Sequence, residues 1–148
     1  MNRRKIWFYS SLLIVLITIT LLVTGSPLLT TALDKNDSIP LGTFITWVGL
    51  IALPLSVYWG IKEFRNPTTK GFKFLSIILK TVIVMAILWV PVSYLLSGNI
   101  SFSFSEKVTF QGGQTAMRWF WRYTYGIALV SLLMLIAYWI MALLRKKH

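Results

Sequence analysis

Four long apolar stretches separated by short polar segments occupy most of this 148-residue chain. They run from Ile6 to Thr24, Leu41 to Ile61, Phe74 to Leu96 and Tyr123 to Leu144. Each is close to the ~20 residues that an α-helix needs to cross the hydrocarbon of a bilayer. Because lipid offers backbone amides and carbonyls no hydrogen-bond partner, spans of this kind are helices and not open sheets. The pattern therefore predicts an all-α membrane protein with four transmembrane helices.

Composition supports the same class of protein. Hydrophobic residues make up 56% of the chain and charged residues only 13%, which leaves too little polar surface for a water-soluble globule. Four helices joined by short connections favour an up-down-up-down bundle, and no linker or internal repeat marks a second unit. We therefore expect one integral membrane domain over residues 1–148.

The net charge of +11 comes from basic residues at the ends of the spans. Ten of them lie on one side: Arg3, Arg4, Lys5, Lys62, Arg65, Lys70, Lys73, Arg145, Lys146 and Lys147. The other side has four, which are Lys35, Lys107, Arg118 and Arg122. The positive-inside rule therefore predicts cytoplasmic N- and C-termini. A nucleic-acid-binding stripe would need a soluble element to carry it, and the sequence offers none, so we expect no nucleic-acid partner.

The N-terminus also has features of a secretory signal peptide, because basic residues precede an apolar run. The run from Ile6 to Val23 is 18 residues long without a charge. Signal peptides have shorter apolar regions of about 7 to 15 residues. We therefore expect an uncleaved first span, which Gly25, Ser26 and Pro27 should end.

The second apolar stretch carries a stripe of small residues on one helix face. At alternating steps of four and three, this stripe contains Gly42, Thr46, Gly49, Leu53, Ser56 and Gly60. Helices in lipid associate through close van der Waals contact and small polar side chains, so the stripe is a predicted helix-packing seam. Packing within the chain and packing against a second copy both stay open. Pro54 and Pro91 predict bends in the second and third spans.

Lys80 is the one charged residue well inside a predicted span. A lysine near the cytoplasmic end of a span can extend its amine back to the headgroups, next to Lys73. A lipid or partner contact and a place on an ion pathway are the two other interpretations, because charges inside a membrane are often functional.

The sequence does not suggest catalysis or metal binding. It contains no cysteine, and no Asp, Glu or His lies in any of the four apolar stretches. The single histidine, His148, ends a basic tail. We therefore expect a non-enzyme with no catalytic residue, no metal and no cofactor. Proton-coupled or cation-coupled transport by this chain alone is disfavoured for the same reason.

The connection between the third and fourth spans has an alternating pattern. Apolar side chains occupy every second position from residue 100 to 110 except at Glu106, namely Ile100, Phe102, Phe104, Val108 and Phe110. Period two over this length predicts a strand, or a short β-hairpin-like loop turning near residues 105–107. It would either cap the bundle or offer an edge to a strand of a partner or of another copy.

Two arginines, Arg118 and Arg122, lie four residues apart just before the fourth span. At this spacing they share one helix face, among tryptophans and tyrosines that are typical of a membrane interface. They have three possible partners: lipid phosphates, the acidic residues Glu106 or Asp37 of the same chain, or an acidic protein partner.

Three features together resemble a known family. They are the basic N-terminus before the first span, the run from Asn99 to Lys107 just outside the third span, and an aromatic-rich fourth span that ends in Leu143-Leu144-Arg145-Lys146-Lys147. These features are similar to those of the immunity proteins against pore-forming colicins of the A and N kind. The resemblance covers the topology over most of the chain and, in sequence, the external loop and the basic tail.

Proteins of that family are small inner-membrane proteins with both termini inside, and they recognise the pore-forming domain of the toxin within the membrane. The resemblance implies a binding role for the external loop and the outer helix ends. The residues proposed to bind a partner are Phe102, Phe104, Glu106, Arg118 and Arg122. The resemblance implies no catalytic residue.

The leading hypothesis is a small inner-membrane interaction protein that protects against a pore-forming bacteriocin. Its partners would be membrane lipids and a protein inside or outside the bilayer. A second hypothesis is an oligomeric pore or sensor subunit, such as a holin-like or phage-defence component, with Gly42, Gly49, Ser56 and Gly60 at the contact between copies. A third is an accessory subunit of a larger membrane complex.

Overall fold

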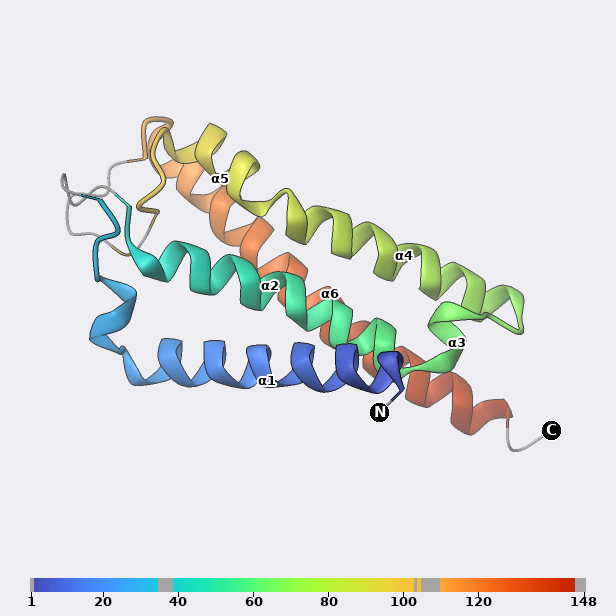
Figure 1. The fold of residues 1–148 in the computed structure, drawn as a ribbon. Coiled ribbons are helices and arrows are strands. Elements are labelled where there is room, and N and C mark those ends of the chain that lie inside the picture. The colour runs from blue at the N-terminus through green and yellow to red at the C-terminus, as the bar shows by residue number, and fades with distance from the viewer. Residues whose placement is uncertain (1, 35–38, 103, 105–109, 146–148) are drawn as a thin grey trace.

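The computed structural model describes residues 2–34, 39–102, 104 and 110–145 of the chain. Its elements are α1 (Arg3–Thr24), the 3-10 turn η1 (Pro27–Leu29), α2 (Leu41–Gly60), α3 (Lys62–Arg65), α4 (Lys70–Ile87), α5 (Trp89–Ser97) and α6 (Gly113–Arg145). The long helices run back and forth along the molecule (Figure 1). One end, called the terminal end here, holds the start of α1, α3 and the end of α6. The opposite end, called the loop end, holds η1, the end of α5 and the start of α6.

The four apolar stretches all lie in helices, as the sequence predicts. In the described part of the chain, α1, α2 and α6 are each long and apolar enough to cross a membrane. α4 and α5 meet the same criterion together, as a pair bent by 54°. Three helices begin before the apolar stretches that they contain, because α1 begins at Arg3, α4 at Lys70 and α6 at Gly113. Backbone hydrogen bonding does not need an apolar environment, so a helix can continue past the point where apolar side chains stop.

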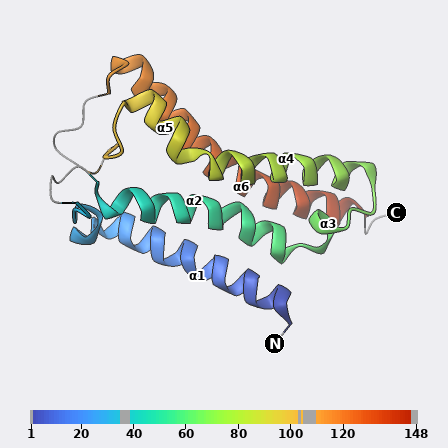
Figure 2. The same cartoon turned by 45° about the horizontal axis from the view of Figure 1, so that its top comes forward.

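α2 is the central helix of the bundle. It packs on α1 on one side and on both α4 and α6 on the other, whereas α1 packs on α2 and η1 (Figure 2). Nine residues of α2 are buried, which places half of its most apolar window inside the molecule. α1 ends at Gly25, whose left-handed conformation (φ 59°) suits a residue without a Cβ. The predicted end of the first helix is therefore confirmed.

The stripe of small residues on α2 faces α1 of the same chain. A Cβ atom on Gly49 would stand 2.4 Å from Cγ2 of Thr18 in α1, and one on Gly60 would stand 2.9 Å from the ring of Phe8. The Thr18 hydroxyl donates a hydrogen bond to the Ile45 carbonyl at 3.4 Å. The missing side chains therefore let the two backbones approach closely, as small residues do between membrane helices.

Elsewhere in the stripe, Gly42, Thr46 and Ser56 are buried and Leu53 is half-buried, whereas Gly60 is exposed. Gly42 lies under the ring of Phe104, and a Cβ at this position would stand 2.8 Å from it. The Ser56 hydroxyl donates to the Leu53 carbonyl at 2.7 Å. The hydroxyl of Thr46 is buried and has no hydrogen-bond partner among the described residues.

Replacing Gly49 with alanine should weaken the α1–α2 interface. The added methyl group meets the short, β-branched Thr18 side chain, which cannot move aside freely, so we expect a loss of about 1–3 kcal/mol. The matched control is Gly126→Ala in α6, where a Cβ meets no atom within 4 Å. It should be neutral or slightly stabilising, because alanine favours helix. Thermal unfolding in detergent measures both, and equal behaviour of the two variants would contradict the described packing.

The bend between α4 and α5 is placed at Leu88, three residues before Pro91. Proline has no N–H and its ring displaces the carbonyl four residues earlier, which here belongs to Ile87. The bend predicted at Pro91 is therefore confirmed in the turn that precedes it. Pro54, by contrast, lies inside α2 without ending the helix.

Two aromatic side chains from other helices bind the carbonyls at this bend. The indole Nε1–H of Trp47 in α2 lies 3.1 Å from the carbonyl oxygens of both Ala86 and Ile87. The Tyr123 hydroxyl in α6 donates to the Met85 carbonyl at 2.5 Å. Three consecutive carbonyls at the break therefore have side-chain donors, which is how a broken helix is tolerated where water is scarce.

Removing the indole donor should destabilise the bend, and restoring a backbone donor should compensate. We expect Trp47→Phe to cost about 1–3 kcal/mol, because it leaves carbonyls unpaired. Pro91→Ala returns an N–H to the helix, so the double variant should lose less than Trp47→Phe alone. The control is Trp139→Phe, an exposed tryptophan of α6. Denaturant titration in micelles gives the double-mutant cycle, and additive losses would show that the two residues are not coupled.

The predicted β-hairpin is not seen in the described residues. Phe102 has a left-handed backbone (φ 48°), and the Phe104 N–H donates to the Ser101 carbonyl at 3.0 Å in a turn. This backbone conformation is incompatible with a strand. Of the alternating apolar residues that the structure describes, Phe102 is buried in the core, and Ile100, Phe104 and Phe110 are half-buried. Residues 103 and 105–109, which include Glu106, lie outside the described residues.

Candidate interaction site at the loop end

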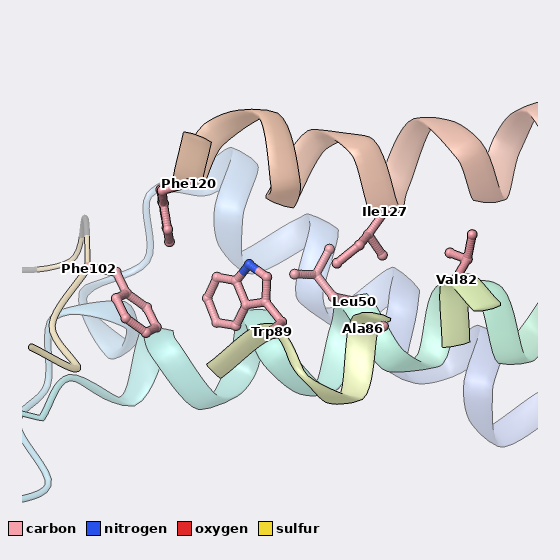
Figure 3. Packing of buried hydrophobic residues seen from close by; sticks show 7 residues of the cluster. All are labelled: Leu50, Val82, Ala86, Trp89, Phe102, Phe120 and Ile127. Carbon is pink, nitrogen blue, oxygen red and sulfur yellow. The ribbon is translucent and has the colours of Figure 1, made fainter. Parts of the chain in front are cut away.

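An aromatic cluster fills the loop end of the bundle. Trp89 begins α5, Phe120 comes from α6, and Phe102 comes from the segment after α5 (Figure 3). The ring centroids are 5.0 Å apart for Trp89 and Phe102, and 5.9 Å for Trp89 and Phe120. The Trp89 indole N–H also donates to the Thr124 hydroxyl at 2.8 Å, so the polar atom of this buried ring is satisfied. The cluster therefore anchors three chain segments to one another.

Short polar contacts hold the segment that carries Phe102. The Asn99 side-chain oxygen accepts hydrogen bonds from the N–H groups of Ser101 and Phe102, at 3.0 and 3.2 Å. The Thr43 hydroxyl of α2 donates to the Ile100 carbonyl at 2.7 Å. Asparagine is well suited to such turns because its side chain can replace a backbone acceptor. These bonds and the burial of the ring maintain the left-handed conformation of Phe102.

The residues proposed from sequence to bind a partner fall into two groups. Phe102 has no exposed surface and Phe104 is half-buried against Gly42, so the ring of Phe102 is part of the core and is not available at the surface. Arg118 and Arg122 are exposed on α6. Glu106 lies outside the described residues. The structure therefore does not bring the four described residues together on one surface.

Helical spacing explains why the arginines are exposed. The buried residues of α6 recur every three or four positions: Ala116, Phe120, Thr124, Ile127, Ser131 and Met134. Arg118 and Arg122 lie off this stripe and are therefore exposed. The Arg122 guanidinium carbon is 5.4 Å from the centroid of the Trp119 ring, a cation–π arrangement. We call Arg118, Trp119 and Arg122 the arginine face.

A cavity of about 320 Å³ lies behind the aromatic cluster. Its lining includes Leu22 of α1, Thr46 of α2, Phe104, and Trp121 and Tyr125 of α6. This volume is at the lower limit of pockets that enclose small ligands. The lining is mostly apolar, with the hydroxyl of Thr46 as a polar group that has no hydrogen-bond partner among the described residues.

Lys80 is exposed on α4, two helical turns from the equally exposed Lys73. Its side chain makes no hydrogen bond or ion pair with any residue in the described ranges. The buried residues of α4, among them Leu79 and Val82, lie on the opposite face. This position leaves the amine free to extend toward the terminal end.

Arg65 at the terminal end has a structural role that sequence analysis missed. Its guanidinium donates to the carbonyls of Tyr58 (2.9 Å) and Trp59, which are in the last turn of α2. A cation at this position satisfies unpaired carbonyls and interacts favourably with the helix dipole. Burial and the nearby positive charge of Arg4 lower the pKa of Arg65 below its ordinary value. The only sequence signal is an arginine five residues after the end of a helix.

Within the described residues, no group of three or more His, Asp or Glu side chains is placed to hold a metal ion. No protein-family model matches the chain, no curated protein matches it in sequence, and no solved structure matches its fold. The resemblance to the colicin immunity proteins therefore rests on the residues and the topology described above.

Truncating Phe102 should destabilise the protein without affecting its surface. We expect Phe102→Ala to cost roughly 3–5 kcal/mol, because it empties a fully buried site between two other rings. Trp119→Ala removes an aromatic ring that is 56% exposed and should change stability little. Thermal unfolding in the same detergent compares them. A stable Phe102→Ala variant would show that the loop does not close over the core.

Proposed function

We propose that this protein is a small, non-enzymatic integral protein of the bacterial inner membrane that binds a protein partner at its loop end. In its most specific form, the proposal is immunity to a pore-forming bacteriocin, through contact with the pore-forming domain of the toxin in the bilayer. Membrane lipids are its surroundings and its second class of partner. No nucleic acid takes part.

The observation that carries the proposal is the arginine face. Arg118 and Arg122 are exposed one turn apart, and Arg122 lies over the Trp119 ring. Arginine and tryptophan are enriched among the residues that dominate binding energy at protein interfaces. The aromatic cluster holds this part of α6 firmly, so little entropy is lost when a partner binds.

The distribution of charge supports the proposed orientation. The described basic residues gather at the terminal end, where Arg3, Lys62, Lys70 and Arg145 lie, whereas Arg118 and Arg122 are at the loop end. Under the positive-inside rule the terminal end faces the cytoplasm. The arginine face then lies at the outer surface, on the side from which a toxin arrives.

The alternative of an oligomeric pore or sensor subunit relied on the small-residue stripe as the contact between copies. Gly49 and Gly60 of that stripe lie against α1 of the same chain. Gly42, Gly49 and Ser56 are buried within the chain and Gly60 is exposed, so most of that stripe is already in contact with the same chain. No contact in the described residues favours an accessory subunit over a protein that acts alone.

The proposal predicts that the arginine face is needed for protection. Cells that express the protein are exposed to a panel of pore-forming bacteriocins, and survival is compared for the unchanged chain and for Arg118→Gln/Arg122→Gln. Loss of one interface arginine typically costs about 2 kcal/mol, or roughly 30-fold in affinity. We therefore expect the double variant to lose protection while its level in the membrane stays the same.

The matched control is Lys62→Gln/Lys70→Gln, which removes the same charge from the terminal end. It should protect as the unchanged chain does. If no bacteriocin in the panel is resisted, the immunity proposal fails. If the arginine variant still protects fully, the function stands and the arginine face is not the binding site.

A further inference from the structure

An apolar groove runs between α4 and α6 beside the bend at Leu88. Val82 and Met85 of α4 form one wall, and Gly126, Ile127 and Val130 of α6 form the other. Its volume is about 210 Å³. This is below the range of about 300–1,000 Å³ for pockets that enclose a drug-sized ligand, so the groove fits a segment of a narrow chain.

Gly126 gives the groove its depth. A Cβ atom at this position would meet no atom within 4 Å, so the open space lies directly over the α6 backbone. The bend of 54° turns α5 out of line with α4. Tyr123 also lines the groove, and its hydroxyl donates a hydrogen bond to the Met85 carbonyl.

A single charged residue, Arg122, lies at the end of this groove nearest the loop end. Its side chain is exposed, and the apolar stretch of α6 begins at the next residue. From Arg122 to Val130 the helix rises about 12 Å, compared with about 15 Å for one leaflet of hydrocarbon. The groove therefore extends from the depth of the headgroups into the leaflet, with its cation at the headgroup end.

We propose that this groove binds one phospholipid, with an acyl chain along Gly126 and Val130 and the headgroup phosphate on the Arg122 guanidinium. Arginine matches phosphate oxygens with paired N–H donors, and the apolar walls match the acyl chain. Lipids with an anionic headgroup should bind this groove more tightly than zwitterionic lipids, because their net negative charge attracts the Arg122 guanidinium more strongly. Arg122 also belongs to the arginine face, but lipid binding in this groove requires no protein partner.

Other occupants fit the groove less well. A free phosphate would use Arg122 but leave the apolar walls uncovered. A partner helix is about 10 Å wide and would contact the rim without filling the space over Gly126. Only a molecule with an apolar tail and an anionic end matches both the apolar walls and the Arg122 guanidinium.

Native mass spectrometry of the whole protein in detergent, with phosphatidylglycerol added, tests the proposal. The unchanged chain should retain one lipid at low lipid concentration. Arg122→Gln should weaken retention about five-fold, the typical effect of one basic residue on an anionic headgroup. Gly126→Leu should abolish it, because the new side chain fills the groove. Inorganic phosphate should not displace the lipid, and its doing so would overturn the role of the acyl chain.

Two matched variants control for charge and for added bulk. Arg118→Gln removes an arginine from the same helix outside the groove, and Ser10→Leu adds an apolar side chain at an exposed position of α1. Both should retain lipid as the unchanged chain does. Equal losses for Arg118→Gln and Arg122→Gln would overturn the site, and so would normal retention by a folded Gly126→Leu variant.

A photo-crosslinking methionine analogue of similar size in place of Met85, in the wall of the groove, makes the test independent of the folding of Gly126→Leu. Irradiation in native membranes should add the mass of a phospholipid at position 85, and more of it than the same crosslinker at position 10. A protein adduct at position 85 would mean that a polypeptide, and not a lipid, occupies the groove. An equal lipid yield at both positions would show that the groove has no preference for lipid.

Discussion

The hydrogen bonds at the α4–α5 break are the interaction on which the arrangement of the bundle depends. Pro91 removes the backbone donor that the Ile87 carbonyl would otherwise have, and the Trp47 indole of α2 donates to the carbonyls of Ile87 and its neighbour Ala86. Tyr123 of α6 binds the preceding carbonyl. Unpaired carbonyls are costly wherever water is excluded. The break between α4 and α5 therefore favours the positions of α2 and α6 that place Trp47 and Tyr123 next to these carbonyls.

The consequences of this bend reach the loop end. Because α5 turns away from the line of α4, Trp89 lies against both Phe102 and Phe120, which also lie against each other (Figure 3). The cluster attaches the segment after α5 to the start of α6, and the arginine face is carried on that same rigid region. At the terminal end, Arg65 binds the last carbonyls of α2. Polar side chains thus stabilise helix ends and breaks, while small residues set the distance between α1 and α2.

Sequence reasoning predicted the candidate site only in part. Arg118 and Arg122 were predicted to share a face, because a spacing of four residues places side chains together on any helix, and both are exposed. For Phe102 the alternation of apolar residues was interpreted as an external strand. Period two identifies which residues are apolar, but a short loop can bury the same residues with turns, as the left-handed Phe102 does.

The sequence alone determined that the chain is helical, where its apolar segments lie and that Pro91 bends one of them. These properties follow from local composition and covalent geometry. The tertiary structure alone decided that the small-residue stripe faces α1 and that Trp47 and Tyr123 bind the carbonyls of the break. It also decided that Gly126 leaves an open groove beside Arg122. Such contacts join residues some 40 positions apart, and helical periodicity says which face a residue occupies but not which helix that face meets.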